Sequence, residues 1–245
     1  MSYVKRLRQL KETLKSYVYN YGKRVDYEVI IGEDVKNVND KGEHDGLLEL
    51  VDIYSKHIKL KHIQTNYENC YNPAPIYNEC IRRSKGEFLV LTNPEVCHKN
   101  NILLGFDQEL EKNKNVYVVP SCENVNNLKF VEGKAYYDHY QWYHHTKYRM
   151  APLHWCNVIS KENYYMIGGF DNKFMYGIAC EDDDFLDKVK QHKKIKIVLR
   201  DDLEVLHAMH QKMHSYVPDY KFLHKKNIEY NKIKRTIRAK EGLFV

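Results

Sequence analysis

The most informative part of this 245-residue chain is the segment Gly168-Gly169-Phe170-Asp171, followed by Tyr176-Gly177 and Glu181-Asp182-Asp183-Asp184-Phe185. A glycine turn and aromatic residues precede four consecutive carboxylates, and a hydrophobic run begins directly after the acids. Adjacent carboxylates repel one another, so a folded protein keeps them near a cation, a sugar hydroxyl or a helix N-terminus. Phe185, Leu186 and Val189 follow at helical spacing, which predicts that the acids occupy a first helical turn. Helix capping alone would account for the acids, but the residues before them favour a functional site.

Those preceding residues resemble a known enzyme family. The chain reads Trp-Cys-Asn-Val-Ile-Ser from Trp155, then Met-Ile-Gly-Gly-Phe-Asp to Asp171 and Phe-Met-Tyr-Gly to Gly177. This order resembles the acceptor-side half of inverting glycosyltransferases with the GT-A fold. The similar groups are family 2 and the β-1,4-galactosyltransferase-like enzymes, whose motif is Gly-Trp-Gly-Gly-Glu-Asp-Asp-Asp. The loop at residues 176–180 differs from that motif while the acids are kept, and the resemblance is specific over roughly a third of the chain.

Length and composition favour one domain with a substantial core, since 43% of the residues are hydrophobic. No apolar run approaches the ~20 residues of a membrane span, and residues 1–8 lack a signal-peptide hydrophobic region. The six cysteines form no Cys-x-x-Cys pair, which favours reduced thiols and a cytoplasmic protein over a zinc ribbon or disulfide framework. The net charge of +6 is spread along the chain and is only weak support for an anionic ligand.

Hydrophobic periodicity predicts alternating helices and strands, and therefore a single α/β domain. Helices are expected at 5–20, 73–81, 103–110 and 220–240, strands at 27–31, 57–64, 86–92, 116–120 and 203–206, and a polar loop at 35–48. The resemblance implies the GT-A form of this class, a Rossmann-like mixed central sheet flanked by helices. Residues 1–120 would form the nucleotide-sugar half, 121–215 the acceptor and catalytic half, and 216–245 a C-terminal helix.

The family's first strand, an apolar run leading into the nucleotide site, has no full counterpart here. The chain begins Met1-Ser-Tyr-Val-Lys-Arg6, which looks like the end of that strand and the following loop. Three explanations stay open: translation starts upstream, residues 1–4 form a short substitute strand, or the donor pocket is incomplete. The hypothesis favoured by the sequence is the first of these, a truncated start that leaves the first strand short.

Acids follow two of the expected strands. Ligands of open α/β sheets bind beyond the carboxyl ends of the strands, where this chain has Glu33-Asp34 and Asn93-Pro94-Glu95. The resemblance implies that Glu33, Asp34, Asn78 and Asn93 bind the nucleotide. Asn78 matches the family's asparagine on the helix that precedes the second of these strands.

The family's metal motif, Asp-x-Asp, is replaced here by Asn93-x-Glu95. Carboxylate and amide oxygens both suit hard divalent ions, and a related Asn-Pro-Asp occurs in rhamnosyltransferase-like members of family 2. The resemblance implies Mn²⁺ or Mg²⁺ bound by Glu95, Asn93 and His207, with His210 as second choice for the histidine. Two alternatives stay open: the Asn-Pro pair is a plain turn, or His207, His210 and His214 hold Zn²⁺ on one helix face.

The resemblance also implies a reaction, in which a sugar passes with inversion from a nucleotide-diphosphate sugar, expected to be a UDP-sugar, to a carbohydrate or glycoconjugate acceptor. Asp182 would take the proton of the acceptor hydroxyl as the new bond forms. Glu181 would orient the acceptor hydroxyls, and Asp184 would cap the helix. Trp155 and Tyr176, together with Glu181, are expected to bind the acceptor.

Other interpretations compete with this one. The aromatic run at 136–145 would either line the acceptor groove or form a helix or loop packed on the sheet. A catalytically degenerate transferase-like protein that binds a sugar or partner is permitted by Asn93 and by the short first strand. A nucleic-acid-binding module lacks a clustered basic motif, and the acids would repel phosphates, so no nucleic-acid partner is expected. A polymerase-like two-metal enzyme would need a palm pattern that the sequence does not contain. The sequence therefore favours the glycosyltransferase.

Overall fold

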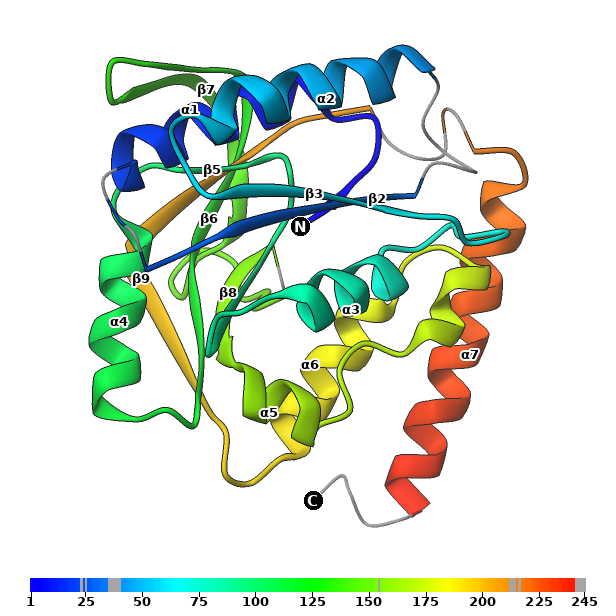
Figure 1. Ribbon diagram of the computed structural model, residues 1–245. Coiled ribbons are helices and arrows are strands. Elements are labelled where there is room, and N and C mark those ends of the chain that lie inside the picture. Colours follow the sequence, from blue (N-terminus) through cyan, green and yellow to red (C-terminus); the bar gives the residue numbers. More distant parts are fainter. Residues whose placement is uncertain are drawn as a thin grey trace.

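The computed structural model describes residues 1–22, 24, 26–34, 41–153, 155–211, 215 and 217–240. Its strands form two sheets (Figure 1). The parallel three-stranded sheet has the order β1 (Ser2–Tyr3), β2 (Val29–Asp34), β3 (Leu60–Thr65). The six-stranded mixed sheet has the order β4 (Phe88–Thr92), β8 (Cys156–Ser160), β6 (Val116–Val131), β9 (Lys196–Ala208), β5 (Val96–His98), with β7 (Lys134–His144) paired to β6.

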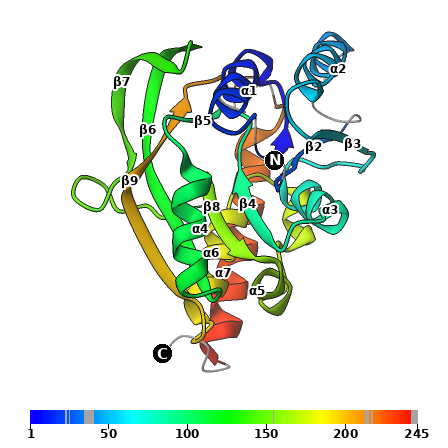
Figure 2. The ribbon, with the colours of Figure 1, turned by 60° about the vertical axis from the view of Figure 1, so that its left-hand side comes forward.

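The helices cover these sheets. They are α1 (Leu7–Tyr21), α2 (Lys41–Ser55), α3 (Ala74–Arg83), α4 (Ile102–Lys112), α5 (Lys161–Met166), the 3-10 helix η1 (Asn172–Tyr176), α6 (Glu181–Gln191) and α7 (Tyr220–Lys240). Figures 1 and 2 show α1 and α2 on one side of β2 and β3 and α3 on the other. Among the described helices, none has both the length and the apolar character needed to cross a membrane.

The helix expected at residues 5–20 is confirmed as α1, and its pattern explains its position. Leu10, Leu14, Tyr17 and Tyr21 recur one turn apart and are all buried. They pack in one hydrophobic cluster with residues of β2, α2 and β3. Burial of this single face, rather than helix propensity, fixes the helix on the sheet.

Two expectations about local structure are wrong. Residues 41–48 belong to α2 and not to a loop, while 35–40 lie outside the described residues. Leu47, Leu50 and Tyr54 form a buried stripe that the surrounding Gly and acidic residues obscured. The aromatic run at 136–145 is neither a helix nor a loop, because most of it forms β7, the outer strand of a long hairpin with β6. Its exposed face is polar and aromatic, so it lacks the clean alternation of a half-buried strand.

The start of the chain forms the short substitute strand. Ser2 and Tyr3 pair with Gly32 and Glu33 of β2. The amino group of Met1 donates a hydrogen bond to the Ile30 carbonyl at 2.8 Å. In the described residues, β1 pairs with β2 but not with β4, so the expected central sheet is present in two parts.

Candidate active site

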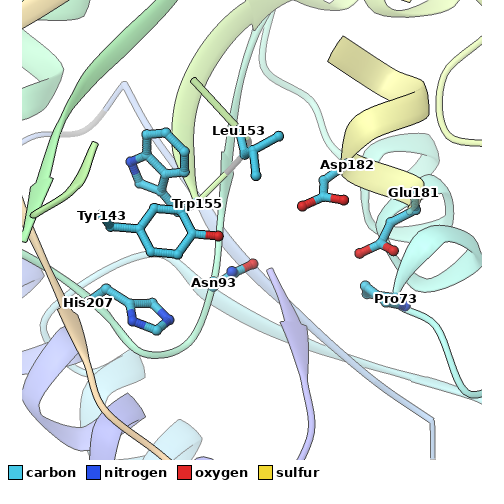
Figure 3. Close-up of a pocket in the computed structure, with 8 residues that line it drawn as sticks. All are labelled: Pro73, Asn93, Tyr143, Leu153, Trp155, Glu181, Asp182 and His207. Atoms are coloured by element: carbon cyan, nitrogen blue, oxygen red, sulfur yellow. The ribbon is translucent and has the colours of Figure 1, made fainter. Parts of the chain in front are cut away.

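A cavity of about 110 Å³ lies where the two halves of the chain meet. It is lined by Pro73, Asn93, Tyr143, Leu153, Trp155, Glu181, Asp182 and His207. Figure 3 shows the two acids of α6 on one side of this pocket and Tyr143, Trp155 and His207 on the other. Five residues singled out in the sequence are therefore brought together here: Asn93, Trp155, Glu181, Asp182 and His207.

The acids lie in the first turn of α6, as the sequence predicted. A sharp turn aims them, because Ala179 and Cys180 both adopt the left-handed conformation, with φ of 65° and 71°. Such backbone is uncommon for residues other than glycine and often occurs at functional sites. No side chain caps the helix at Cys180, so the first-turn N–H groups and the helix dipole favour negative charge there.

Glu181 and Asp182 differ in their surroundings. Glu181 is 8% exposed and accepts a hydrogen bond of 2.6 Å from Nδ2 of Asn72. Burial, together with the adjacent Asp182 charge, raises the pKa of Glu181 to about 8. Burial also raises the pKa of Asp182. Burial and, after it, the Asp182 charge both disfavour ionisation of Glu181, so we infer that Glu181 keeps its proton at neutral pH.

Asp184 does not cap the helix, and that expectation is wrong. Its side chain is fully buried and faces α7, where it pairs with Lys234 at 2.9 Å and with Arg238. Lys188 on the next turn of α6 lies 3.1 Å away. Burial alone would raise the pKa of Asp184, but the lysine and arginine charges outweigh it and lower the pKa. Asp184 therefore anchors α6 to α7.

A second polar group, called here the Glu95 cluster, consists of Glu95, His207 and His210. One potential ligand atom from each lies within 4.8 Å of the others. Oε1 of Glu95 is 3.6 Å from Nε2 of His207 and 3.4 Å from Nε2 of His210. Backbone pairing holds the group in place, since Val96 pairs with His207 and the Ala208 N–H donates to the Glu95 carbonyl.

The donor set of the Glu95 cluster fits a divalent cation. Two imidazole nitrogens and a carboxylate oxygen converge without forming a tight hydrogen bond, and Mn²⁺ accepts such mixed ligands. Burial would raise the pKa of Glu95, but its interactions with His207 and His210 and the nearby Arg6 charge outweigh burial and hold the pKa below its ordinary value, so Glu95 is a carboxylate. The guanidinium of Arg6 lies 3.8 Å from the other Glu95 oxygen and adds a fixed positive charge.

The third member of this cluster is His210, whereas the expected third ligand was Asn93. The Asn93 Oδ1 atom accepts a hydrogen bond from the Tyr77 hydroxyl, so Asn93 lines the pocket beside the cluster. The alternative of zinc on a helix face is wrong in its geometry, because His207 lies on β9 and His210 follows that strand. His214 lies outside the described residues.

Glu33 and Asp34 lie at the end of β2, away from the residues that line the pocket. Glu33 accepts hydrogen bonds from His44 at 2.7 Å and His62 at 3.1 Å. Asp34 accepts from the Thr65 hydroxyl at 3.0 Å. Both carboxylates are buried, so their immediate partners are protein groups.

Asn78 and Tyr176 also lie apart from the pocket. Asn78 donates to the Phe170 carbonyl at 2.9 Å and accepts from the Tyr164 hydroxyl, so it supports the glycine turn before the acids. Tyr176 is 47% exposed, and its ring lies under Lys226. The structure therefore does not bring either residue into contact with Asp182.

Two further residues belong to the site: Tyr143, which is part of the aromatic run considered for the acceptor groove, and Asn72, which no sequence pattern marks. The Tyr143 ring packs on Trp155 at 5.0 Å and on His207 at 5.6 Å between ring centroids, which joins the acceptor-side aromatic residue to the Glu95 cluster. Its position in the aromatic run was a usable signal. Asn72 gave none, because its contact with Glu181 spans 109 positions of sequence.

No protein-family model matches this chain, and no curated protein matches it in sequence. Its structure is similar to TarS 1–349 of S. aureus in complex with UDP-GlcNAc, with a TM-score of 0.64 and 14% identity over 91% of this chain and 62% of that one. It is also similar to GalNAc-T7 with UDP, GalNAc and Mn²⁺ (TM-score 0.63, 13% identity, 83% of this chain and 41% of that one). A third similar structure is the mannosyltransferase PcManGT from Pyrobaculum calidifontis with GDP-Man and Mn²⁺ (TM-score 0.60, 11% identity, 86% of this chain and 56% of that one).

The chain thus spans less than two thirds of the length of each of these proteins. At 11–14% identity the similarity shows the fold alone. The chain has the GT-A type of α/β fold, with a mixed central sheet flanked by helices, as the sequence predicted.

Proposed function

We propose that this protein is an inverting glycosyltransferase that moves a sugar from a nucleotide-diphosphate sugar to a hydroxyl group of a carbohydrate or glycoconjugate. The observation that carries the proposal is the pocket itself, in which the α6 carboxylates face the side of the chain that holds the Glu95 cluster. Support comes from similar folds whose structures contain UDP, UDP-GlcNAc or GDP-Man.

Asp182 is the proposed general base. An alcohol is a weak nucleophile, so a carboxylate must accept its proton as the bond to the sugar forms. Burial raises the pKa of Asp182 from its ordinary value, which makes the carboxylate a better proton acceptor. Direct attack by the hydroxyl, without a covalent intermediate, gives inversion at the sugar carbon.

Glu181 is proposed to orient the acceptor. With its pKa raised to about 8, it keeps a proton at neutral pH and can donate a hydrogen bond to a sugar oxygen. Asn72 fixes one oxygen of this side chain. Tyr143 and Trp155 provide the aromatic wall on which a sugar ring could stack.

The proposed donor side lies at the Glu95 cluster. A divalent cation, Mn²⁺ or Mg²⁺, would be held by Glu95, His207 and His210 and would offset the negative charge of the departing diphosphate. Arg6 would contribute a fixed charge on the same side. Asn93 lines the pocket and remains a proposed nucleotide contact. Glu33, Asp34 and Asn78 do not line the pocket, so they would contribute to nucleotide binding through the side chains and backbone groups that they hydrogen-bond.

Two further expectations stay within the proposal. A UDP-sugar is the preferred donor class, and the location is proposed to be cytoplasmic because all six cysteines are buried free thiols. A second candidate is a degenerate transferase-like protein that binds a sugar nucleotide without turnover. It is favoured by Asn93, which stands where the resembling family's Asp-x-Asp motif has an acid and whose side chain accepts a hydrogen bond from Tyr77.

The test measures release of nucleoside diphosphate from UDP-, GDP- and dTDP-sugars in the presence of Mn²⁺ and a panel of carbohydrate acceptors. D182N should lower kcat by about 10²–10⁴-fold while leaving nucleotide affinity unchanged. D183N is the matched control, since Asp183 is on the same helical turn but does not line the pocket. Transfer by D182N at the wild-type rate would refute the role of Asp182. Nucleotide binding without turnover in the wild-type protein would favour the second candidate.

A further inference from the structure

The C-terminal helix α7 packs on the body of the protein through a mostly polar side. Its buried residues are Leu223, Asn227, Asn231 and Arg238, and only the first of these is apolar. Asn227 donates a hydrogen bond of 2.9 Å to the Phe174 carbonyl, and Arg238 pairs with Asp184. The contact between α7 and the body therefore consists largely of hydrogen bonds and ion pairs.

Three large apolar residues of α7 lie on the opposite side. Phe222 is 68% exposed, Ile233 58% and Ile237 49%. Phe222 and Ile233 are about three helical turns apart, so they face the same way, and Ile237 follows one turn later. They form a line about 22 Å long on a helix that Figure 1 shows along the right-hand edge of the molecule. Isolated exposed apolar residues are common, but an aligned set on a helix whose buried side is polar indicates a binding face.

Basic residues surround this apolar line. The helix contains eight lysine and arginine residues and a single glutamate, Glu229. Three of the basic residues pair with Asp171, Asp184 and Asp187 of the body. The other five are exposed, and they are Lys221, Lys225, Lys226, Lys232 and Lys240. The outer face of α7 thus combines a line of apolar side chains with a strong positive charge.

A lipid bilayer with anionic headgroups fits both properties. Anionic lipids attract lysines that lie within about 10 Å of the surface. When a helix lies flat on a bilayer, its Phe and Ile side chains enter the boundary between headgroups and acyl chains. A lysine between them, such as Lys226, extends its methylene stem along the apolar surface and keeps its ammonium group among the headgroups.

Other occupants fit this face less well. A protein groove that received the helix would have to desolvate Lys226 and Glu229, which lie between Phe222 and Ile233 on the same stripe. A nucleic acid would use the lysines but would leave the isoleucines in water. A second copy docked through the same face would place lysines against lysines.

We propose that the outer face of α7 is a docking surface through which the protein binds reversibly to bilayers that contain anionic lipids. The helix lies flat on the bilayer, with Phe222, Ile233 and Ile237 at the depth of the headgroups and the lysines at the lipid phosphates. This function goes beyond the proposed sugar transfer and does not depend on it, because none of these residues lines the pocket.

The test is co-sedimentation of the full chain with two kinds of vesicle. One contains phosphatidylcholine alone, and in the other phosphatidylglycerol replaces about one third of the lipid. The protein should bind the second kind at least about tenfold more tightly. Raising NaCl from about 0.1 M to about 0.5 M should weaken that binding by about tenfold or more.

Two variants separate the charged and apolar contributions. K226E/K232E reverses two charges beside the apolar line, and I233Q/I237Q replaces two of its side chains with polar ones. Each variant should weaken binding to the anionic vesicles by about fivefold or more. Since all four residues are exposed, Tm should stay at the wild-type value, which verifies that the variants are folded.

The matched controls change the same residue types elsewhere on the surface. K11E/K134E alters exposed lysines of α1 and β7, and L104Q/V131Q alters exposed apolar residues of α4 and β6. Both controls should bind the anionic vesicles as the wild type does. A loss in the controls as large as that in the α7 variants would overturn the assignment to this face.

Absence of binding to either kind of vesicle would overturn the proposal, as would equal binding to both kinds. Unchanged binding by both folded α7 variants would do the same. A wild-type dimer that I233Q/I237Q dissociates, with no binding to vesicles, would instead assign the face to a second copy of this chain. No nucleotide or sugar enters these measurements, so their failure is distinguishable from failure of the proposed transferase activity.

Discussion

At the scale of single residues, the pocket separates two adjacent acids by their environments. Glu181 is buried against Asn72, while Asp182 faces the cavity from the same helical turn. Burial raises the pKa of both groups, and the Asp182 charge raises that of Glu181 further. Neighbouring carboxyl groups with different surroundings can act as a base and as a hydrogen-bond donor.

This difference predicts a pH dependence of stability. An acid whose pKa is raised in the folded state contributes stability below its unfolded pKa, near 4.5, and that contribution is lost as pH rises through about 8. Because Gln does not titrate, E181Q should not show this loss. Between pH 5 and pH 9 the free energy of unfolding of E181Q should therefore rise relative to that of the wild type by on the order of 1–4 kcal/mol. Urea unfolding at both pH values measures this. D52N, at an exposed position on α2, is the control, and equal pH slopes for wild type and E181Q would contradict the assignment.

At the scale of elements, α7 is fastened to α6 through charged groups. Asp184 is buried between Lys188, Lys234 and Arg238, and Lys234 also pairs with Asp171 at 2.6 Å. Figure 1 shows the two helices beside each other. The contact fixes the helix whose first turn carries Glu181 and Asp182, so it positions the pocket indirectly.

Breaking this contact should be costly. D184N removes the charge that three cations share in a buried site, and loss of one partner of a buried ion pair typically costs about 3–5 kcal/mol. The free energy of unfolding from urea titration should fall by that amount. The control is E229Q, which removes one charge of the exposed Lys225–Glu229 pair on α7. It should change the free energy of unfolding by less than about 0.5 kcal/mol. A loss below about 1 kcal/mol in D184N would show that the network does not anchor α7.

Elements with one strong apolar face could be predicted from the sequence. α1, α3 and α4 are predictable because their buried apolar residues recur at helical spacing, and β4 because it is a continuous apolar run. α7 is predictable from apolar residues at helical spacing, although its buried positions are mostly polar. α2 was missed because glycine and acids interrupt its stripe, and β7 because its exposed face carries tyrosines. The acids of α6, Glu95 and His207 were recognisable from residue type, whereas Asn72 acts through a contact between distant parts of the chain.

At the scale of the whole molecule, both expected halves contribute to one pocket. Asn93 comes from the first half and Tyr143, Asp182 and His207 from the second, while the division at residue 120 remains a prediction. The short β1 leaves the GT-A sheet in two parts, and Arg6, just after β1, reaches the Glu95 cluster. Arg6 therefore links the segment after the N-terminal strand to the Glu95 cluster.

We propose that the Glu95 cluster and the pocket together bind a nucleoside diphosphate with a divalent cation. Calorimetric titration of UDP, GDP and dTDP, each with and without Mn²⁺, tests it most directly. We expect Mn²⁺-dependent binding of at least one nucleotide. This binding should be weakened about tenfold or more in E95Q but unchanged in H139Q, whose histidine lies outside the cluster. Absence of Mn²⁺-dependent binding for all three nucleotides, or equal binding by wild type and a folded E95Q, would contradict it.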